Sequence, residues 1–427
     1  MEITRGQDEN RLTFFDNLRY LLVLCVVLQH ASFAYSGLTW WPVSDGNTSV
    51  VAGWLSSMFD AFTMPLLFYI AGYFALPTMQ KKGIAQFLMG KLKRLGIPWL
   101  VCIVTICPIL PLIYHYTRER LTLSMSYFDL WLKVMNNFAR FDIGLITSMD
   151  TLMQHDQFYQ RYMWFLSLLL LFFFIFALIY RLKISWFEAS PNATEYKAPS
   201  VSSTIKLLLS VGFLTFIPSF ITIGMILFFG PDSSNPEPLF TLGNVIQFRP
   251  SRIFVFVLYF AMGVVTYRNR WIERGKFPGD PKTWAVSFIV ITAAYLYTQH
   301  LMLSGPEDLR ELFGIIFFFL LNFLTISTLG LFTSLAIRYW NRPTPVNRSL
   351  ASVSYDIYLS HYIFVLAFQL LLLTAYGVPG LIKFAVVSAL SILCAYLMSR
   401  FLIKPHPRLA VATAVALFVV MALVVHP

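Results

Sequence analysis

Residues 18–38 read LRYLLVLCVVLQHASFAYSGL, an apolar run interrupted by an arginine near its start and a histidine beyond its middle. A helix of this length crosses the ~30 Å hydrocarbon core of a bilayer. Ten further apolar runs follow, at 54–76, 97–114, 162–180, 205–229, 252–268, 284–303, 312–337, 353–375, 378–402 and 409–425. The sequence therefore predicts an all-α fold, a polytopic bundle of transmembrane helices.

The composition excludes a soluble fold. Of the 427 residues, 57% are hydrophobic and 12% are charged, whereas soluble domains carry about 25% charged residues. We expect one membrane domain of ten transmembrane helices over residues 1–402. Residues 403–427 add a C-terminal helix that spans the bilayer or lies in its interface, because its apolar run is at the lower length limit for spanning.

The positions of lysine and arginine predict the orientation of the chain. With a cytoplasmic N-terminus, 23 of the 32 lysines and arginines fall on the cytoplasmic side, as basic flanks favour. We therefore expect a multi-pass protein of the plasma (inner) membrane with its N-terminus in the cytoplasm. Topology and anionic membrane lipid account for the net charge of +11, so no nucleic acid partner is expected.

Arg19 and His30 are ionisable residues of the first run, where charge is costly. Eleven steps of ~100° bring them to within ~20° of each other on the helix face, with His30 ~16 Å deeper. A cation near the membrane border and a deeper imidazole would thus share one face. Alternatively, Arg19 reaches lipid phosphate and His30 hydrogen-bonds a neighbouring helix.

The second run contains Asp60 and Gly72. Because this helix runs opposite to the first, Asp60 reaches a depth comparable to that of His30, where its carboxylate would orient the imidazole ring. A hydrogen bond from Asp60 to backbone or hydroxyl groups of the bundle is the alternative. Gly72 predicts close packing against another helix.

Lys91 and Arg94 lie in a basic connection that ends at Pro98. At a spacing of i,i+3 they share one face of a predicted short helix, which suits the binding of phosphate groups. A basic loop that only sets the topology would have the same composition.

The ninth run contains SYDIYLSH at 354–361. Asp356 and Ser360 share a helix face at i,i+4, which favours a structural polar network, and His361 lies ~12 Å from the inner border. For His361 the sequence leaves a structural and a functional role open.

Several motifs resemble those of a known family, in that family's order. They are FDNLR at 15–19 with ten residues to His30, AGYF at 71–74, RLGIP at 94–98, WFL at 164–166 and SYDIYLSH at 354–361. Over about residues 11–402 the chain resembles the acyltransferase 3 family of membrane acyltransferases. HASFAYS at 30–36 and the following Trp40-Trp41 are most similar to the branch that contains the glucan biosynthesis C protein.

The resemblance implies transfer of an acyl group, acetyl or succinyl, from cytoplasmic acyl-coenzyme A to a hydroxyl of an extracytoplasmic carbohydrate or glycan. His30 would act as general base or be acylated transiently. The expected catalytic residues are His30, Arg19 and Asp60. The residues expected to bind acyl-coenzyme A are Arg19, Lys91, Arg94 and His361. No metal is expected.

Trp40, Trp41 and Trp164 are expected on the outer side, where aromatic faces suit the stacking of a sugar acceptor. An ordinary belt of interfacial tryptophans is the alternative. The main rival function is a proton-coupled transporter or flippase of a sugar or lipid-linked sugar, in which His30, Asp60 and Asp356 would relay protons. The sequence lacks the internal symmetry common in transporters.

Overall fold

The computed structural model describes residues 13–38, 40–119, 126–147, 158–188, 200–230, 232, 235, 237–272 and 279–424. Among these residues, nine helices are long and apolar enough to cross a membrane. They are α1 (Thr13–Phe33), α2 (Val50–Lys82), α8 (Trp164–Leu182), α9 (Val201–Phe229), α10 (Pro250–Arg268), α11 (Pro281–Ser304), α12 (Arg310–Tyr339), α13 (Pro345–Leu371) and α14 (Gly380–Met398). The predicted polytopic helical bundle is confirmed.

The third apolar run differs from its prediction as a single span over 97–114. It forms α3 (Ile84–Lys91), the π-helical turn η1 (Leu92–Gly96), α4 (Ile97–Thr105) and α5 (Ile109–Glu119). The first three are continuous, and α5 is bent by 42° from them, so the pair counts as a tenth candidate span. Pro108 stands at the bend, where it has no N–H to donate to a continuing helix.

The prediction that Lys91 and Arg94 occupy a short helix within a connection is wrong. Only Gly83 separates α2 from α3, and its φ of 75° is a positive value that residues with a side chain rarely adopt. Lys91 ends α3 and Arg94 lies in η1, so both belong to the long bent helix.

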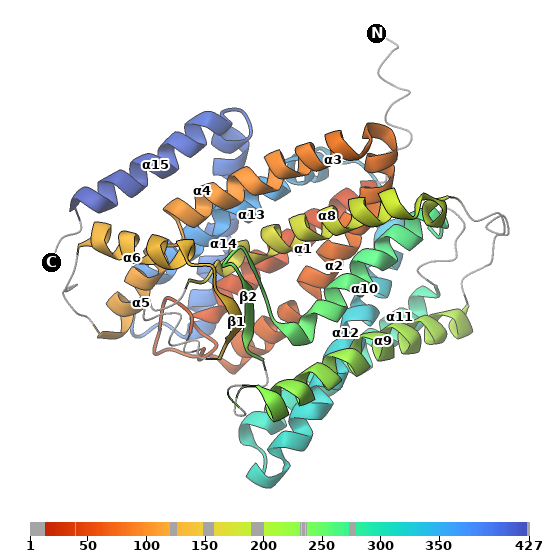
Figure 1. The fold of residues 1–427 in the computed structure, drawn as a ribbon. Helices are drawn as coiled ribbons and strands as arrows, with labels where there is room; N and C mark the ends of the chain where they lie inside the picture. Colours follow the sequence, from red (N-terminus) through yellow and green to blue (C-terminus); the bar gives the residue numbers. More distant parts are fainter. Residues whose placement is uncertain are drawn as a thin grey trace.

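The C-terminal helix α15 (Pro407–Val424) is apolar but is not among the nine candidate spans. It follows the π-helical turn η5 (Ser399–Ile403), and its Phe418 ring contacts Tyr127 and Trp131 of α6 (Tyr127–Ala139). Figure 1 places α15 at one edge of the bundle. An eleventh crossing therefore remains a prediction. Residues 1–12 and 425–427, at the predicted domain ends, lie outside the described residues.

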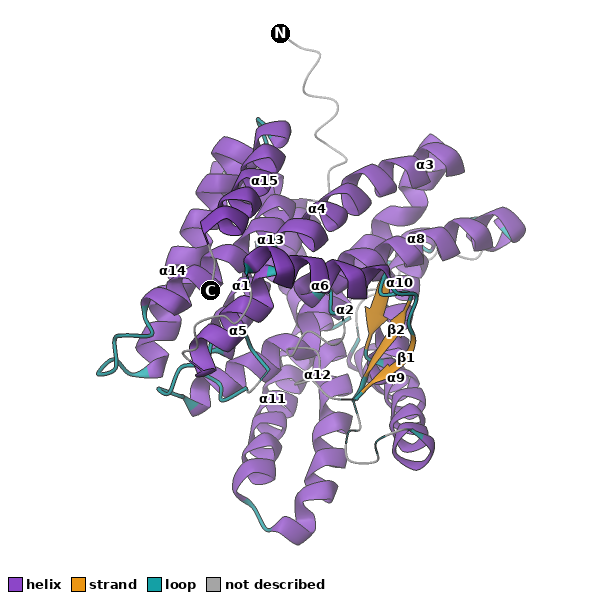
Figure 2. Ribbon diagram, turned by 60° about the vertical axis from the view of Figure 1, so that its left-hand side comes forward, coloured by secondary structure: helices purple, strands orange, loops and turns teal. Residues whose placement is uncertain are grey.

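Helix α1 lies at the centre, packed against α2, α12, α13 and α14. On its far side α2 packs closely against α10, where a side chain at Gly72 would collide with the Phe260 carbonyl and one at Gly263 with the Tyr69 carbonyl. The close packing predicted at Gly72 is thus confirmed. Helices α9, α11 and α12 form the edge of the bundle opposite α15, and the α11–α12 hairpin protrudes from it (Figures 1 and 2).

A small antiparallel sheet, absent from the prediction, joins two connections between helices (Figure 2). Its strands, in order, are β1 (Ile143–Ile146), β2 (Leu239–Leu242) and β3 (Ile246–Phe248). Gly243 and Asn244 in the three-residue connection of the β2–β3 hairpin have φ values of 60° and 58°, positive values that suit the two central residues of a β-turn from Leu242 to Val245. The sheet matters because it anchors one wall of the cavity described below.

Short polar side chains begin several of the long helices. Ser49 caps α2, Asp280 caps α11 and Thr344 caps α13, each accepting a backbone amide of the first turn. Hydrogen bonds from the Thr283 hydroxyl and amide lower the pKa of the Asp280 carboxyl. These caps fix where each span starts.

Candidate active site

The candidate residues line two cavities within the described part of the bundle. The first, of about 290 Å³, we name the histidine cavity; its lining includes His30, Trp40, Trp41, Asp60, Arg161, Trp164, Arg249, Arg252 and Tyr362. The second, of about 380 Å³, we name the basic cavity; its lining includes Arg19, Lys82, Lys91, Arg94, Phe173, Ser354, Tyr355 and Tyr358. Helices α1, α2, α8 and α13 contribute to both.

The two cavities are stacked along the helices that they share. Met64 lines the histidine cavity and Leu67 the basic one, three residues along α2. On α13 the corresponding residues are Tyr362 and Tyr358, with His361 between them. Because a helix rises ~1.5 Å per residue, the dividing layer is about one helical turn thick.

His30, at the histidine cavity, contacts His361, which lies within this layer and lines neither cavity. His30 Nδ1 lies 2.8 Å from His361 Nε2, and the two rings are nearly parallel, with an interplanar angle of 4°. His361 is fully buried in α13, whereas His30 is half-buried and faces the histidine cavity. The sequence placed His361 among the donor-binding residues; the structure brings it to the imidazole of His30 instead.

The hydrogen bonds of His361 define the protonation of the neutral pair. Its Nδ1 lies 2.7 Å from the Tyr358 carbonyl oxygen, which only accepts, so Nδ1 carries the proton. Nε2 then accepts the Nδ1 proton of His30. The available lone pair of His30 is therefore on Nε2. A general base needs such a lone pair to accept a proton.

Aromatic rings hold the His30 side chain in place. The Trp41 ring stacks on it at 5.6 Å between centroids, and the edge of Tyr362 lies at 5.2 Å. Trp41 donates from Nε1 to Gln369 Oε1 at 2.8 Å, and Gln369 Nε2 donates to the His30 carbonyl at 3.2 Å. One glutamine of α13 thereby fixes both stacked residues.

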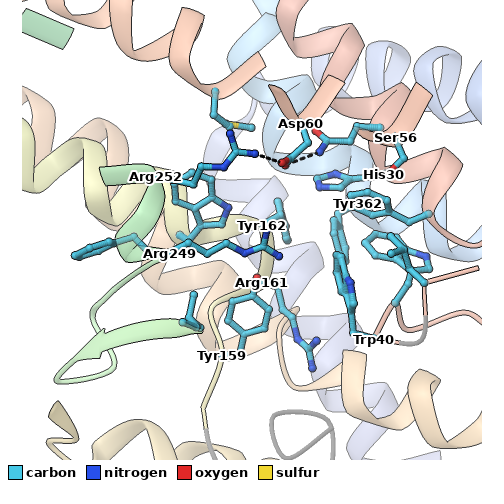
Figure 3. Close-up of a pocket in the computed structure, with 18 of the residues that line it drawn as sticks. His30, Trp40, Ser56, Asp60, Tyr159, Arg161, Tyr162, Arg249, Arg252 and Tyr362 are labelled. Carbon is cyan, nitrogen blue, oxygen red and sulfur yellow. Dashed lines mark hydrogen bonds and ion pairs between the residues drawn. The ribbon is translucent and has the colours of Figure 1, made fainter. Parts of the chain in front are cut away.

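Asp60 lines the histidine cavity, but its partners are not the one predicted. Its carboxylate accepts from Gln29 Nε2 at 3.1 Å and from Arg252 Nη2 at 2.7 Å (Figure 3). Among the described residues, the ring of His30 is hydrogen-bonded by His361 and not by Asp60. With 48% of its side chain exposed, Asp60 presents a carboxylate to the cavity.

Arg19 lies at the other end of α1, in the basic cavity. It pairs with Asp16 at 2.9 Å and donates to the Ser354 hydroxyl at 3.3 Å and the Ala351 carbonyl at 3.1 Å. These contacts join α1 to α13 and direct the guanidinium toward the cavity. Arg19 and His30 therefore share a helix but line different cavities.

Lys91 and Arg94 also line the basic cavity, as cations over aromatic rings. Lys91 Nζ lies 4.0 Å from the ring centroid of Phe173, and the Arg94 guanidinium 5.3 Å from that of Tyr355. Among the described residues that line this cavity, none is acidic. The cavity is thus suited to an anion.

The three tryptophans selected from the sequence all line the histidine cavity. Trp41 is only 1% exposed and covers His30, whereas Trp40 and Trp164 are partly exposed. Asp356 lines neither cavity, and no hydrogen bond between described residues joins it to His30 or Asp60. The predicted proton relay is therefore not assembled in this structure.

Sequence reasoning missed the arginines of the histidine cavity. Arg161, Arg249 and Arg252 stand at the ends of apolar runs, where basic residues usually contact lipid headgroups. One sequence signal pointed to a buried site near them: Gln160 and Gln247 stand among apolar residues, as polar side chains of a protein interior do. It could not identify the cavity that they face.

These features define the class: a polytopic membrane protein with a basic cavity and an oriented imidazole in a second, aromatic cavity. The acyltransferase 3 family, described as an acyltransferase domain, matches residues 12–400. The chain belongs to this family and is a membrane acyltransferase. No curated protein and no solved structure matches the chain significantly.

Proposed function

We propose that the protein is an O-acyltransferase that moves an acetyl or succinyl group from cytoplasmic acyl-coenzyme A to a hydroxyl of an extracytoplasmic carbohydrate or glycan. The observation that carries the proposal is the stacking of the two cavities, with His30 on the histidine-cavity side of the dividing layer and its partner His361 within that layer. A donor in one cavity and an acceptor in the other would meet at His30.

The basic cavity is the proposed donor site. Acyl-coenzyme A carries several phosphates, and Arg19, Lys91 and Arg94 supply cations without an acidic residue in the described lining. Lys91 and Arg94 would bind the diphosphate at the mouth, and Arg19 would bind further in. The thioester would then reach the dividing layer beside His361.

The histidine cavity is the proposed acceptor site. Trp40 and Trp164 offer partly exposed rings for a sugar face, and the exposed carboxylate of Asp60 can accept from sugar hydroxyls. The branch resemblance of residues 30–36 and Trp40-Trp41 also supports a carbohydrate acceptor. The distribution of basic residues supports an inner-membrane location with this cavity on the extracytoplasmic side.

In the proposed reaction His30 Nε2 removes the proton of the acceptor hydroxyl as its oxygen attacks the thioester carbonyl. The carbon–sulfur bond breaks, and protonated His30 gives its proton to the departing coenzyme A thiolate, which restores the neutral imidazole. The products are the O-acyl ester and free coenzyme A. His361 would keep Nδ1 of His30 bonded, so that Nε2 alone exchanges protons.

The test uses protein reconstituted in proteoliposomes, with radiolabelled acetyl- or succinyl-coenzyme A on one side and an oligosaccharide acceptor on the other. We expect label in the oligosaccharide and stoichiometric release of coenzyme A. Empty liposomes and liposomes with a His30→Ala variant are the controls. Sugar uptake coupled to a proton gradient, without label transfer, would support the transporter function and reject this one.

A further inference from the structure

Counted over the described residues, the histidine cavity contains more positive charge than its acidic partners neutralise. Three arginines line it, Arg161, Arg249 and Arg252 (Figure 3). Arg252 pairs with Asp60 at 2.7 Å and Arg249 with Glu237 at 3.0 Å. Within the part of the chain that the structure describes, no carboxylate pairs with Arg161.

The Arg161 side chain is buried without full hydrogen bonding. The residue is 4% exposed, and its Nη1 has no hydrogen-bond partner among the described residues. The guanidinium lies 5.1 Å from the ring centroid of Tyr159, a contact that offsets only part of its desolvation. A buried, unpaired charge is costly, so the cavity holds an unused anion-binding group.

The backbone of Arg161 is held in an unfavourable conformation. Its φ is 57°, in the left-handed region that residues with a side chain rarely adopt. The preceding Gln160 is fully buried; its amide N–H donates to Gln247 at 2.8 Å, and its side-chain oxygen accepts from Trp99 at 2.8 Å and Ser167 at 2.9 Å. Strain that is fixed by so many contacts is typical of functional sites.

The β2–β3 hairpin contributes to this clamp. Gln160 Nε2 donates to the carbonyls of Asn244 and Val245, at 3.0 and 2.6 Å, in the hairpin turn. The sheet, α4 and α8 thus all hold Gln160, and through it they fix the position of Arg161 in the cavity wall. The cost of the strained backbone and the buried charge would be offset when an anion occupies the cavity.

We propose that Arg161 binds a carboxylate carried by one of the two reactants in the histidine cavity. A carboxylate fits because one arginine is left without an acidic partner among the described residues, and because the planar guanidinium can bind it through two parallel hydrogen bonds. The carboxylate has two possible sources, the far end of the acyl group or an acidic sugar of the acceptor. This proposal rests on the proposed function only for the identity of the reactants.

A binding experiment tests the carboxylate preference independently of catalysis. Isothermal titration of the protein in lipid nanodiscs compares monomethyl succinate with dimethyl succinate, and methyl glucuronide with methyl glucoside. In at least one pair we expect the carboxylate to bind about 10- to 100-fold more tightly, the value of charge-assisted hydrogen bonds. Equal affinity within both pairs would overturn the proposal, whether or not the protein transfers acyl groups.

Variants then attribute the preference to Arg161. Arg161→Met keeps the apolar stem and removes the charge, so the preference should disappear, while Arg161→Lys should retain part of it. Arg140→Gln, at an exposed arginine outside both cavity linings, is the matched control and should behave as wild type. If Arg161→Met does not fold, the comparison between Arg161→Lys and wild type remains. An unchanged preference in Arg161→Lys and Arg161→Met would assign the anion to Arg249 or Arg252 and reject Arg161.

Transfer assays identify the source of the carboxylate. A preference for succinyl- over butyryl-coenzyme A that is lost in Arg161→Met places it on the acyl group. A preference for a glucuronic acid-containing acceptor over its neutral counterpart places it on the acceptor. Preference for phosphorylated acceptors over both carboxylate pairs would contradict the proposed ligand chemistry. If no transfer occurs with any pair, the proposed function fails while the binding result stands.

Discussion

The histidine cavity and the basic cavity share four helices, yet they hold their polar groups in different ways. In the histidine cavity, His30 is fixed by His361, Trp41 and Tyr362, and Asp60 by Arg252 and Gln29. In the basic cavity, Lys91 and Arg94 rest on aromatic rings at 4.0 and 5.3 Å. The first arrangement positions individual atoms, as catalysis requires, and the second supplies positive charge with looser geometry, which is sufficient to attract an anion.

The largest effect should follow from removing the atom that the histidine cavity positions. His30→Ala is expected to lower kcat for acyl transfer by about 10²- to 10⁴-fold, because it removes the proposed general base. Donor binding, measured separately by titration with acyl-coenzyme A, should be nearly unchanged, since His30 does not line the basic cavity. Wild-type turnover in a folded His30→Ala protein would remove His30 from the mechanism.

The second prediction concerns the rigidity of the histidine cavity wall. Lys383 of α14 and Asp45, four residues beyond Trp41, form a pair at 2.7 Å with side chains 0% and 3% exposed. Lys383→Met leaves a buried carboxylate unpaired and should destabilise the protein by about 3–5 kcal/mol. Denaturant unfolding in detergent micelles measures this change.

A double variant provides the control for that ion pair. Lys383→Met with Asp45→Leu removes both charges and should be more stable than Lys383→Met alone, because no buried charge remains unpaired. A double variant as unstable as the single one would mean that packing, and not the charge, dominates at this contact.

The third prediction tests the role of His361 as the residue that positions His30. His361→Leu removes the acceptor for His30 Nδ1 and should lower kcat about 10- to 100-fold, the value of one buried hydrogen bond left unmade. His361→Gln offers an amide oxygen near the position of Nε2 and should restore much of the activity. Equal losses in the two variants would show that volume at this position matters more than the hydrogen bond.

The smallest effect is expected in the basic cavity. Lys91→Ala combined with Arg94→Ala should raise the dissociation constant for acyl-coenzyme A about 3- to 10-fold at low salt. Because these contacts are electrostatic, the difference from wild type should shrink as ionic strength rises. Lys93→Ala, at a neighbouring lysine that does not line the cavity, is the control, and a salt-independent difference would argue against phosphate binding.

The sequence predicted the spans well where hydrophobicity alone decides them. Local patterns of length and periodicity predict the polytopic bundle and the close packing at Gly72. They also predict that Arg19 and His30 lie on one helix. The structure extends the third span back to Ile84, so that it includes Lys91 and Lys93. Hydrophobicity does not predict this extension. A basic helix that packs on α8 has the same composition as a basic loop.

The candidate site was only partly predictable. His30, Asp60 and the three tryptophans could be selected from the sequence because ionisable and aromatic residues are conspicuous in apolar runs, and the structure places all of them in the lining of one cavity. The partners were not predictable: His361 lies 331 residues from His30, and Arg252 lies 192 residues from Asp60. The neighbouring Gln160 hinted at burial, but Arg161 itself could not be selected, since its importance depends on its own burial and on the lack of a partner among the described residues.

The sequence by itself thus determined that the chain crosses a membrane many times, that α1 has a cation at one end and an imidazole deeper in, and that the family motifs are in order. Those properties depend on transfer free energy and helix geometry, which are local. Only the tertiary structure decided that two cavities are stacked, that His361 orients His30, and that Arg161 has no carboxylate partner among the described residues. Pairing and burial are set by which helices pack together, and that choice is made by the whole bundle.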